Sequence, residues 1–132
     1  MKIVGKRISR GTASGEALVS KEPISFLGGV DPETGVVSEK GHPLEGRALA
    51  GKVLIFPRGK GSTVGAYVLY RLRKSGRAPA AMINVDADIT VASGAIISGI
   101  PMLHRLEKDP LELKDGTEVF VNAEEGYIEV KE

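Results

Sequence analysis

Residues 58–63, with the sequence Arg-Gly-Lys-Gly-Ser-Thr, contain the side chains best suited to chemistry in this chain. They place a hydroxyl, that of Ser62, after the cations Arg58 and Lys60 and directly before a segment with helical spacing. The first turn of a helix exposes unpaired N–H groups and the positive end of the helix dipole, and both attract negative charge. The run therefore predicts a site for a carboxylate or a phosphate.

The residues around Ser62 each have a binding role and an ordinary one. Arg58 suits bidentate contact with an oxyanion and Lys60 suits point-charge contact, but both are also ordinary solvated loop cations. Gly61 lets the backbone approach a ligand in a conformation that a side chain would forbid. Thr63 can bind a substrate or help to cap the helix, and the sequence does not separate these roles.

Ser62 itself has two interpretations. It stands where a helix N-cap belongs, and a serine cap stabilises a helix by about 1 kcal/mol. It could instead accept a proton, but a hydroxyl is a very poor base near neutral pH unless cations and amide groups stabilise its alkoxide. Spacing alone favours the cap, since most capping serines do no chemistry.

The elements on either side of this run determine its position. Residues 52–56 form a largely apolar run typical of a buried strand. Residues 64–75 carry apolar side chains at helical spacing, and Gly76 ends the helix. A second helix is predicted over residues 91–98, whose small and apolar side chains suit close packing.

Short strand patterns separated by glycine turns occupy much of the remaining chain. The last pair, joined by residues 122–126, predicts an antiparallel hairpin that closes a barrel or a sheet. The predicted fold is therefore an α/β domain with a mixed sheet or barrel-like β core and a few helices against part of it. The predicted strands cover residues 3–8, 16–19, 52–56, 80–85, 101–103, 118–122 and 127–130.

Other polar and glycine-rich positions are interpreted as mainly structural. Residues 28–35 contain sharp turn formers, so they are either a plain connection or a wall of the same pocket. His42 and His104 lack the paired spacing of metal ligands. Asp86 and Asp88 follow a predicted strand, where acidic residues usually cap the next helix, and Asp86 is kept as a pocket candidate.

Composition limits the classes of function. The length of 132 residues predicts one domain, residues 1–132, and 42% hydrophobic residues are enough for its core. With 18 basic and 17 acidic residues, the chain has no overall field that would draw it onto nucleic acid or an anionic membrane. Without cysteine, it cannot ligate an iron–sulfur cluster through thiolates. The sequence shows no signal-peptide or membrane-spanning pattern, which predicts a cytoplasmic protein.

Longer motifs occupy residues 28–35, 42–46 and 51–63, and they are accompanied by Asn84, Asp86 and residues 99–101. Together they resemble the small subunit of the archaeal aconitase X family, over nearly the whole chain. The resemblance implies the swivelling β/β/α domain of aconitase. It also implies a heterodimer whose large subunit holds a [4Fe-4S] cluster and most substrate contacts, and the absence of cysteine from this chain agrees with that division.

The resemblance also implies a reaction and roles for the residues of the loop. It implies loss of water from (R)-5-phosphomevalonate, a small phosphorylated hydroxy acid, to give trans-anhydromevalonate 5-phosphate in the archaeal mevalonate pathway. Ser62 would be the general base, and Arg58, Lys60, Gly61 and Thr63 would bind the substrate. Such a dehydration needs a base on one side and a Lewis acid on the other, and this chain could supply only the base. No metal ligand is predicted within it.

Two further functions are compatible with the sequence. Other aconitase X members dehydrate a hydroxyproline. The chain could also be a non-catalytic swivelling module that binds a partner or carries a group, because residues 95–102 and the C-terminal hairpin resemble mobile domains of phosphoenolpyruvate-utilising enzymes. Those domains use a phosphorylated histidine, and Gly94 stands at that position here, which argues against phosphotransfer.

Overall fold

The computed structural model of this chain describes residues 1–131. The strands are β1 (Lys2–Val4), β2 (Lys6–Ser9), β3 (Thr12–Val19), β4 (Val53–Phe56), β5 (Ala81–Asn84), β6 (Met102–His104), β7 (Glu118–Asn122) and β8 (Tyr127–Val130). The helices are α1 (Phe26–Gly29), α2 (Gly65–Lys74), α3 (Ile89–Ser98) and the short 3-10 helix η1 (Pro110–Glu112).

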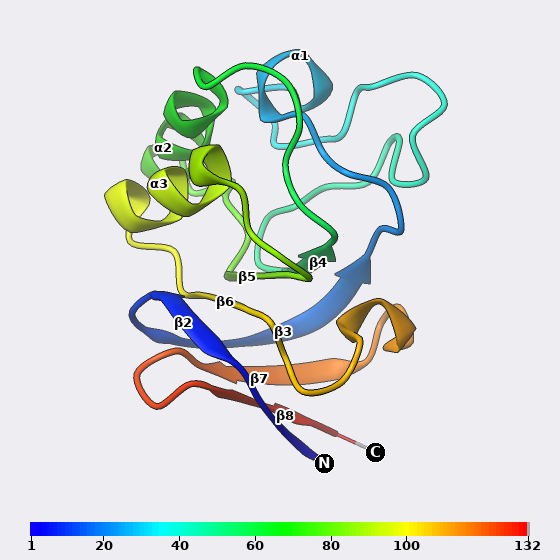
Figure 1. The fold of residues 1–132 in the computed structure, drawn as a ribbon. Coiled ribbons are helices and arrows are strands. Elements are labelled where there is room, and N and C mark those ends of the chain that lie inside the picture. Colours follow the sequence, from blue (N-terminus) through cyan, green and yellow to red (C-terminus); the bar gives the residue numbers. More distant parts are fainter. Residues whose placement is uncertain (132) are drawn as a thin grey trace.

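The strands form one sheet that the N-terminal segment closes on itself (Figure 1). Within residues 1–131 the 8 strands lie in the order β1-β8-β7-β3-β4-β5-β6-β2. β1 and β2 stand at the two ends of this order, yet only Gly5 separates them in the chain. The N-terminal segment therefore pairs antiparallel with β8 along its first part and with β6 along its second part, which gives a barrel-like closure.

The parallel strands β4, β5 and β6 are covered on both faces. In β4 the side chains alternate, because Val53 and Ile55 pack in the cluster inside the barrel while Leu54 and Phe56 pack in the cluster that includes the helices. Burial of both faces explains why this strand reads as a continuous apolar run in the sequence. α2 and α3 lie side by side over this part of the sheet (Figure 1).

This architecture confirms the predicted α/β fold with a mixed, barrel-like β core. The C-terminal hairpin is confirmed as β7 and β8, although the N-terminal segment rather than the hairpin makes the closure. The strand predicted over residues 3–8 is divided at Gly5, whose N–H donates to the carbonyl of Gly126 at 2.9 Å where the segment changes partner. α3 begins at Ile89, before the predicted residue 91, because Asp88 caps it.

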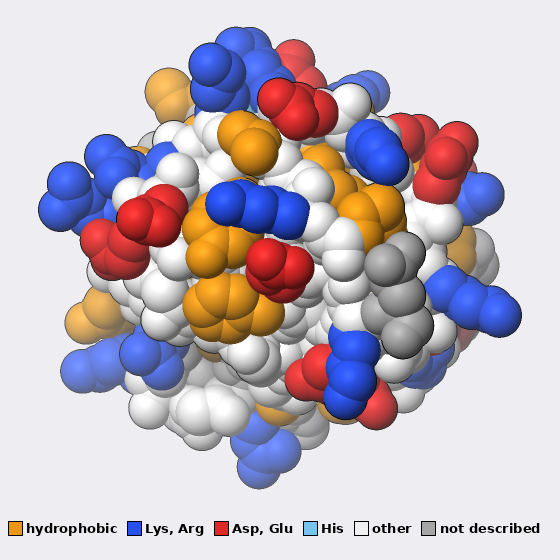
Figure 2. Space-filling model, turned by 90° about the horizontal axis from the view of Figure 1, so that it is seen from below, with side chains coloured by type: hydrophobic (Ala, Val, Ile, Leu, Met, Phe, Trp, Pro, Cys, Tyr) orange, Lys and Arg blue, Asp and Glu red, His pale blue; other side chains and the backbone are white. Residues whose placement is uncertain are grey.

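The surface differs between the barrel and the helices. On the face seen from below the barrel, Lys and Arg side chains are mixed with Asp and Glu side chains, and apolar groups are interspersed among them (Figure 2). α2 and α3 instead expose large apolar side chains, among them Tyr67, Ile96 and Ile97. No helix within residues 1–131 is long and apolar enough to cross a bilayer.

Candidate functional site

The loop that follows β4 is attached to the start of α3 by Asp88. The N–H of Gly59 donates to Oδ1 of Asp88 at 2.7 Å. Oδ2 of the same carboxylate accepts the N–H groups of Thr90 and Val91 at 3.1 and 3.3 Å, which caps α3. One side chain therefore satisfies unpaired amides of a helix and fixes the path of the loop before Ser62.

On its other side, the loop pairs with the segment that leads into α1. The N–H of Ile24 donates to the carbonyl of Arg58 at 3.2 Å, and the N–H of Lys60 donates to the carbonyl of Ile24 at 3.0 Å. Gly61 then turns the chain with φ +90°, and a Cβ at this position would lie only 2.8 Å from Oγ of Ser25. Glycine is thus required at position 61 by its backbone conformation and by the close approach of Ser25.

Ser62 is exposed and lies just outside α2. Its Oγ accepts the N–H of Val64 at 3.1 Å, which closes a local turn, and α2 begins at Gly65 with Val64 in the N-cap position and no side-chain cap. Ser62 is therefore not the N-cap residue of α2, which is Val64, but its Oγ caps the turn that leads into the helix. The O–H of Ser62 has no acceptor among residues 1–131, so the hydroxyl is available to a ligand.

The two cations of the loop are in different situations. Nζ of Lys60 forms an ion pair with Oε2 of Glu39 at 2.9 Å. The exposed guanidinium of Arg58 has no hydrogen-bond or ion-pair partner among residues 1–131. Arg58 is therefore the cation of this loop that is free to receive an anion, whereas a ligand of Lys60 would have to share it with Glu39.

Only the first part of the predicted loop at residues 28–35 lies near this site. The N–H groups of Ser38 and Glu39 donate to the carbonyl of Gly29 at 2.9 and 3.3 Å, which holds Gly29 beside the carboxylate that pairs with Lys60. Gly35 lies elsewhere, since a Cβ there would meet the carbonyl oxygen of Arg77 after α2. The segment therefore comes near the loop at its start and is a connection near its end, and none of its residues lines the cavity next to the loop.

The structural interpretation of His42 is confirmed. The ring is buried, the N–H of Leu44 donates to Nδ1 at 3.0 Å, and Nε2 lies 3.0 Å from the carbonyl oxygen of Pro23. Because Nδ1 accepts a hydrogen bond, the proton of the neutral ring is on Nε2. His42 holds together two parts of the long connection between β3 and β4.

His104 and Asp86 lie at the carboxyl ends of β6 and β5. Nδ1 of His104 accepts the N–H of Ala87 at 3.0 Å, and burial, together with the charge of Arg105, lowers the pKa of this histidine against the opposing effect of Asp86. Oδ1 of Asp86 accepts from Nε of Arg105 at 2.9 Å. Asp86 therefore makes an ion pair and does not cap α3, unlike Asp88.

A cavity of about 290 Å³ lies at this end of the parallel strands, next to the loop. Ligands of α/β proteins bind at the carboxyl ends of the parallel strands, so its position suits a binding site. Beside it, Nδ2 of the buried Asn84 donates to the carbonyl of Phe56 at 3.1 Å and ties β5 to the start of the loop. The lining residues are Pro57, Arg58, Val85, Asp86, Leu106, Lys108, Asp109, Pro110 and Leu111.

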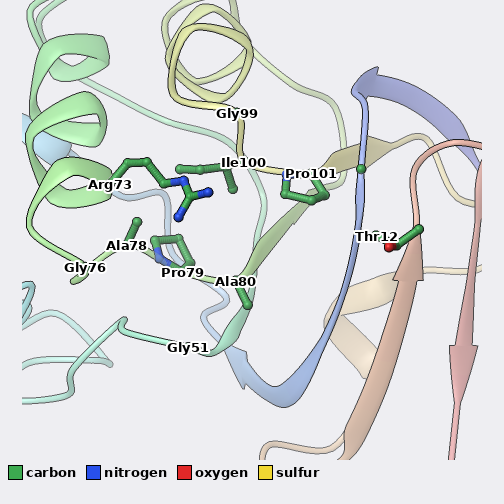
Figure 3. A pocket seen from close by; sticks show the side chains of 11 residues that line it. Thr12, Gly51, Arg73, Gly76, Ala78, Pro79, Ala80, Gly99, Ile100 and Pro101 are labelled. Atoms are coloured by element: carbon green, nitrogen blue, oxygen red, sulfur yellow. The ribbon is translucent and has the colours of Figure 1, made fainter.

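A second cavity, of about 420 Å³, lies at the opposite ends of the same strands (Figure 3). Its lining includes Gly51 and Ala80, which precede β4 and β5, and the guanidinium of Arg73, whose Nε donates to the carbonyl of Ser98 at 3.3 Å. No residue of the loop at 58–63 borders it. The carboxyl ends of α2 and α3 face this region and disfavour anions, so it is a poor match for the predicted ligand.

The structure identifies two residues near the loop that sequence analysis did not assign to it. Asp88 was expected to be a cap, which is confirmed, but its bond to Gly59 has no sequence signal because the two residues are 29 positions apart. No sequence pattern indicated a role for Glu39, although its carboxylate pairs with Lys60. Within residues 1–131, no group of three His, Cys, Asp or Glu side chains is placed to hold a metal ion.

Comparison with protein families identifies the class of this protein. The model of the family described as the aconitase X swivel domain matches residues 2–130. The chain belongs to this family, which agrees with the resemblance noted in its sequence motifs.

Individual relatives are similar over most or nearly all of their length. The phosphomevalonate dehydratase small subunit of Methanosarcina mazei is 60% identical, over 98% of this chain and 91% of its own. The protein of the same name from Methanocella arvoryzae is 63% identical, over 98% of this chain and 99% of its own. The crystal structure of Thermococcus kodakaraensis aconitase X in its holo-form contains a chain with a TM-score of 0.95 and 50% identity, and the match covers 100% of this chain and 99% of that one.

Proposed function

We propose that this chain is the small subunit of a heteromeric hydro-lyase that dehydrates (R)-5-phosphomevalonate to trans-anhydromevalonate 5-phosphate. The observation that carries the proposal is the 60% and 63% identity to relatives named phosphomevalonate dehydratase small subunit, over nearly the whole chain. The enzyme would serve the archaeal mevalonate pathway. Its phosphorylated substrate does not cross membranes freely, so we place the enzyme in the cytoplasm.

Ser62 is the proposed general base. In the reaction its alkoxide oxygen takes the proton from the carbon next to the substrate carboxylate, and the electron pair left on that carbon expels the hydroxyl from the neighbouring carbon. The alkoxide requires nearby positive charge, which the amides at the start of α2 can supply. The unengaged O–H of Ser62 supports this role.

The site is one-sided in this chain and is completed by a partner in our proposal. Ser62, Thr63 and Lys60 are exposed, and an exposed alkoxide would be protonated by water. The aconitase X family implies a [4Fe-4S] cluster, and this chain has no cysteine to hold it, so we assign the cluster to the large subunit. When bound there, the cluster supplies the Lewis acid for the departing hydroxyl.

The large subunit is expected to cover the apolar face formed by Tyr67 and Tyr70 of α2 with Ile96 and Ile97 of α3. Tyr67 is 61% exposed and Ile97 is 65% exposed, which is unusual for side chains of this size in a helix layer. A groove in this face is lined by Tyr67, Tyr70 and Ile97 together with Ala66 and Thr63, so a partner seated on the face would also reach the loop of Ser62. Because the apolar face extends to the loop of Ser62, we expect the large subunit, which must reach that loop, to cover it.

The proposal is tested by producing the chain together with the large subunit of the same organism. The purified pair should dehydrate (R)-5-phosphomevalonate, and each subunit alone should not. Conversion of a hydroxyproline instead would support the runner-up reaction of the family. Full activity of the large subunit alone would leave this chain a non-catalytic swivelling module and would overturn the proposed role of Ser62.

A further inference from the structure

We infer that the cavity at the carboxyl ends of β4, β5 and β6 is a phosphate subsite in which Arg58 and Lys108 bind the terminal phosphate of the substrate. The inference rests on the proposed function, because it assigns a place to one part of that substrate. It adds Lys108, which lies far along the chain from the loop of Ser62, to the residues that contact the ligand.

The position of the cavity suits a substrate that also reaches Ser62. Its walls come from the residues that follow the three parallel strands, among them Pro57, Val85 and Leu106. Arg58 is part of the lining and is close to Ser62 in the same loop, within about 14 Å even for an extended chain. A hydroxy acid with a phosphate at its far end could therefore extend from Ser62 into the cavity.

The two cations that line the cavity lack carboxylate partners in the described part of the chain. Within residues 1–131, neither Arg58 nor Lys108 has a carboxylate at ion-pair distance, and the Lys108 ammonium donates to Sδ of Met1 at 3.5 Å. The two acids of the lining are already engaged. Asp86 pairs with Arg105 at 2.9 Å, and Oδ1 of Asp109 accepts the N–H of Leu111 at 3.0 Å as the cap of η1.

The chemistry of the two cations matches a phosphate monoester. The guanidinium of Arg58 can bind two phosphate oxygens with parallel hydrogen bonds, and the ammonium of Lys108, which also lines the cavity, can act as a compact point charge. Val85, Leu106 and Leu111 provide an apolar lining that suits the methylene groups leading to the phosphate. A substrate without the phosphate would leave both cations without a ligand.

The test uses the heterodimer with Lys108→Ala, and Lys114→Ala serves as the matched control because Lys114 is also exposed and its side chain has no partner in residues 1–131. Lys108→Ala should raise the KM for (R)-5-phosphomevalonate about tenfold or more, since a charge-assisted hydrogen bond is lost. The Kd of inorganic phosphate, measured by calorimetry, should rise similarly. The Kd of mevalonate, which lacks the phosphate, should change by less than about twofold, and Lys114→Ala should resemble the wild type.

The outcomes separate this inference from the proposed function. If Lys108→Ala leaves both the KM for the phosphorylated substrate and the Kd of inorganic phosphate at wild-type values, the phosphate subsite is wrong while the dehydratase assignment stands. If the wild-type heterodimer does not convert (R)-5-phosphomevalonate, the proposed function fails, and the calorimetric comparison still tests the phosphate site. Equal weakening of phosphate and mevalonate binding by Lys108→Ala would also overturn the inference, because it would indicate a general disturbance of the site.

Discussion

The carboxylate of Asp88 accepts the backbone N–H of Gly59 at 2.7 Å while it caps α3, and this joins the loop of Ser62 to a helix that follows a different strand. A Cβ on Gly59 would lie 2.5 Å from Cγ2 of Val91 and 3.0 Å from Oδ1 of Asp88, so only glycine allows the close approach. The loop is therefore held in place at its base, although Ser62 near its end is exposed.

Removing Asp88 should weaken both the fold and the site. Asp88→Ala removes the cap of α3 and leaves the Gly59 N–H without its acceptor, so we expect a loss of about 1–2 kcal/mol in the free energy of unfolding. We also expect a lower kcat in the heterodimer, because the path of the loop before Ser62 is no longer fixed. Urea unfolding and steady-state kinetics measure the two effects.

The control for Asp88 is Asp31→Ala. Oδ1 of Asp31 also accepts a backbone N–H, that of Glu33 at 2.9 Å, but no hydrogen bond or ion pair within residues 1–131 joins this turn to residues 58–63. This variant should lose some stability and keep its kcat. A wild-type kcat in Asp88→Ala would show that the bond to Gly59 does not position Ser62.

The local elements of this fold could be predicted from the sequence, but the contacts that assemble the site could not. β4 and α2 could be predicted because the spacing of their apolar residues follows from which of their faces are buried. β3 begins at Thr12, before the predicted residue 16, because its first half is half-exposed and is defined by pairing with β7 rather than by apolar residues. Long-range pairing of this kind leaves little local pattern.

In the candidate site, too, the local elements could be predicted from the sequence and the long-range contacts could not. The glycine-rich run and its position before a helix were visible in the sequence, whereas the separate turn that Oγ of Ser62 closes with Val64 ahead of α2 was not. The bond between Asp88 and Gly59 and the pairing of Lys60 with Glu39 depend on how distant segments pack. Barrel closure likewise depends on the change of partner at Gly5, which periodicity does not record.

Gly61 gives a test of the loop geometry. Gly61→Ala must adopt φ +90°, which we expect to cost about 1–2 kcal/mol, and its Cβ would also lie 2.8 Å from Oγ of Ser25. Ser25→Ala removes that oxygen and leaves a Cβ contact of 3.6 Å. In a double-mutant cycle, the pair of substitutions should therefore be less destabilising than the sum of the single ones. Strict additivity in urea unfolding would mean that the two residues do not meet as described.

Ser62→Ala tests the proposed base. The side chain is exposed and its one internal bond is the turn to Val64, so the variant should fold and bind the large subunit normally. Its kcat should fall by roughly 10²–10⁴-fold, the usual contribution of general acid–base catalysis. Ser14→Ala, which removes an exposed hydroxyl from β3, should keep full activity. A normal kcat in Ser62→Ala would remove this hydroxyl from the mechanism.

Ile97 tests the surface proposed for the large subunit. This side chain of α3 is 65% exposed, so Ile97→Asp should leave the isolated chain folded while it places a charge in an apolar contact. We expect association with the large subunit to weaken about tenfold or more, measured by size-exclusion chromatography and calorimetry. Ile97→Val keeps the apolar contact and should associate normally. Unchanged association of Ile97→Asp would place the interface elsewhere.

His104 should make the stability of the chain depend on pH. Burial and the charge of Arg105 lower its pKa below the ordinary value of 6.5, so the unfolded chain binds a proton more readily than the folded chain. The contribution of His104 to stability is therefore complete above about pH 6.5 and is lost as the pH falls from there towards the lower folded pKa. His104→Asn keeps an acceptor for the N–H of Ala87 but does not titrate. Urea unfolding at pH 7.5 and 5.5 should show a larger loss of stability in the wild type than in this variant, because carboxylates affect both proteins alike. An equal loss in the two proteins would mean that His104 titrates with the same pKa in the folded and the unfolded chain.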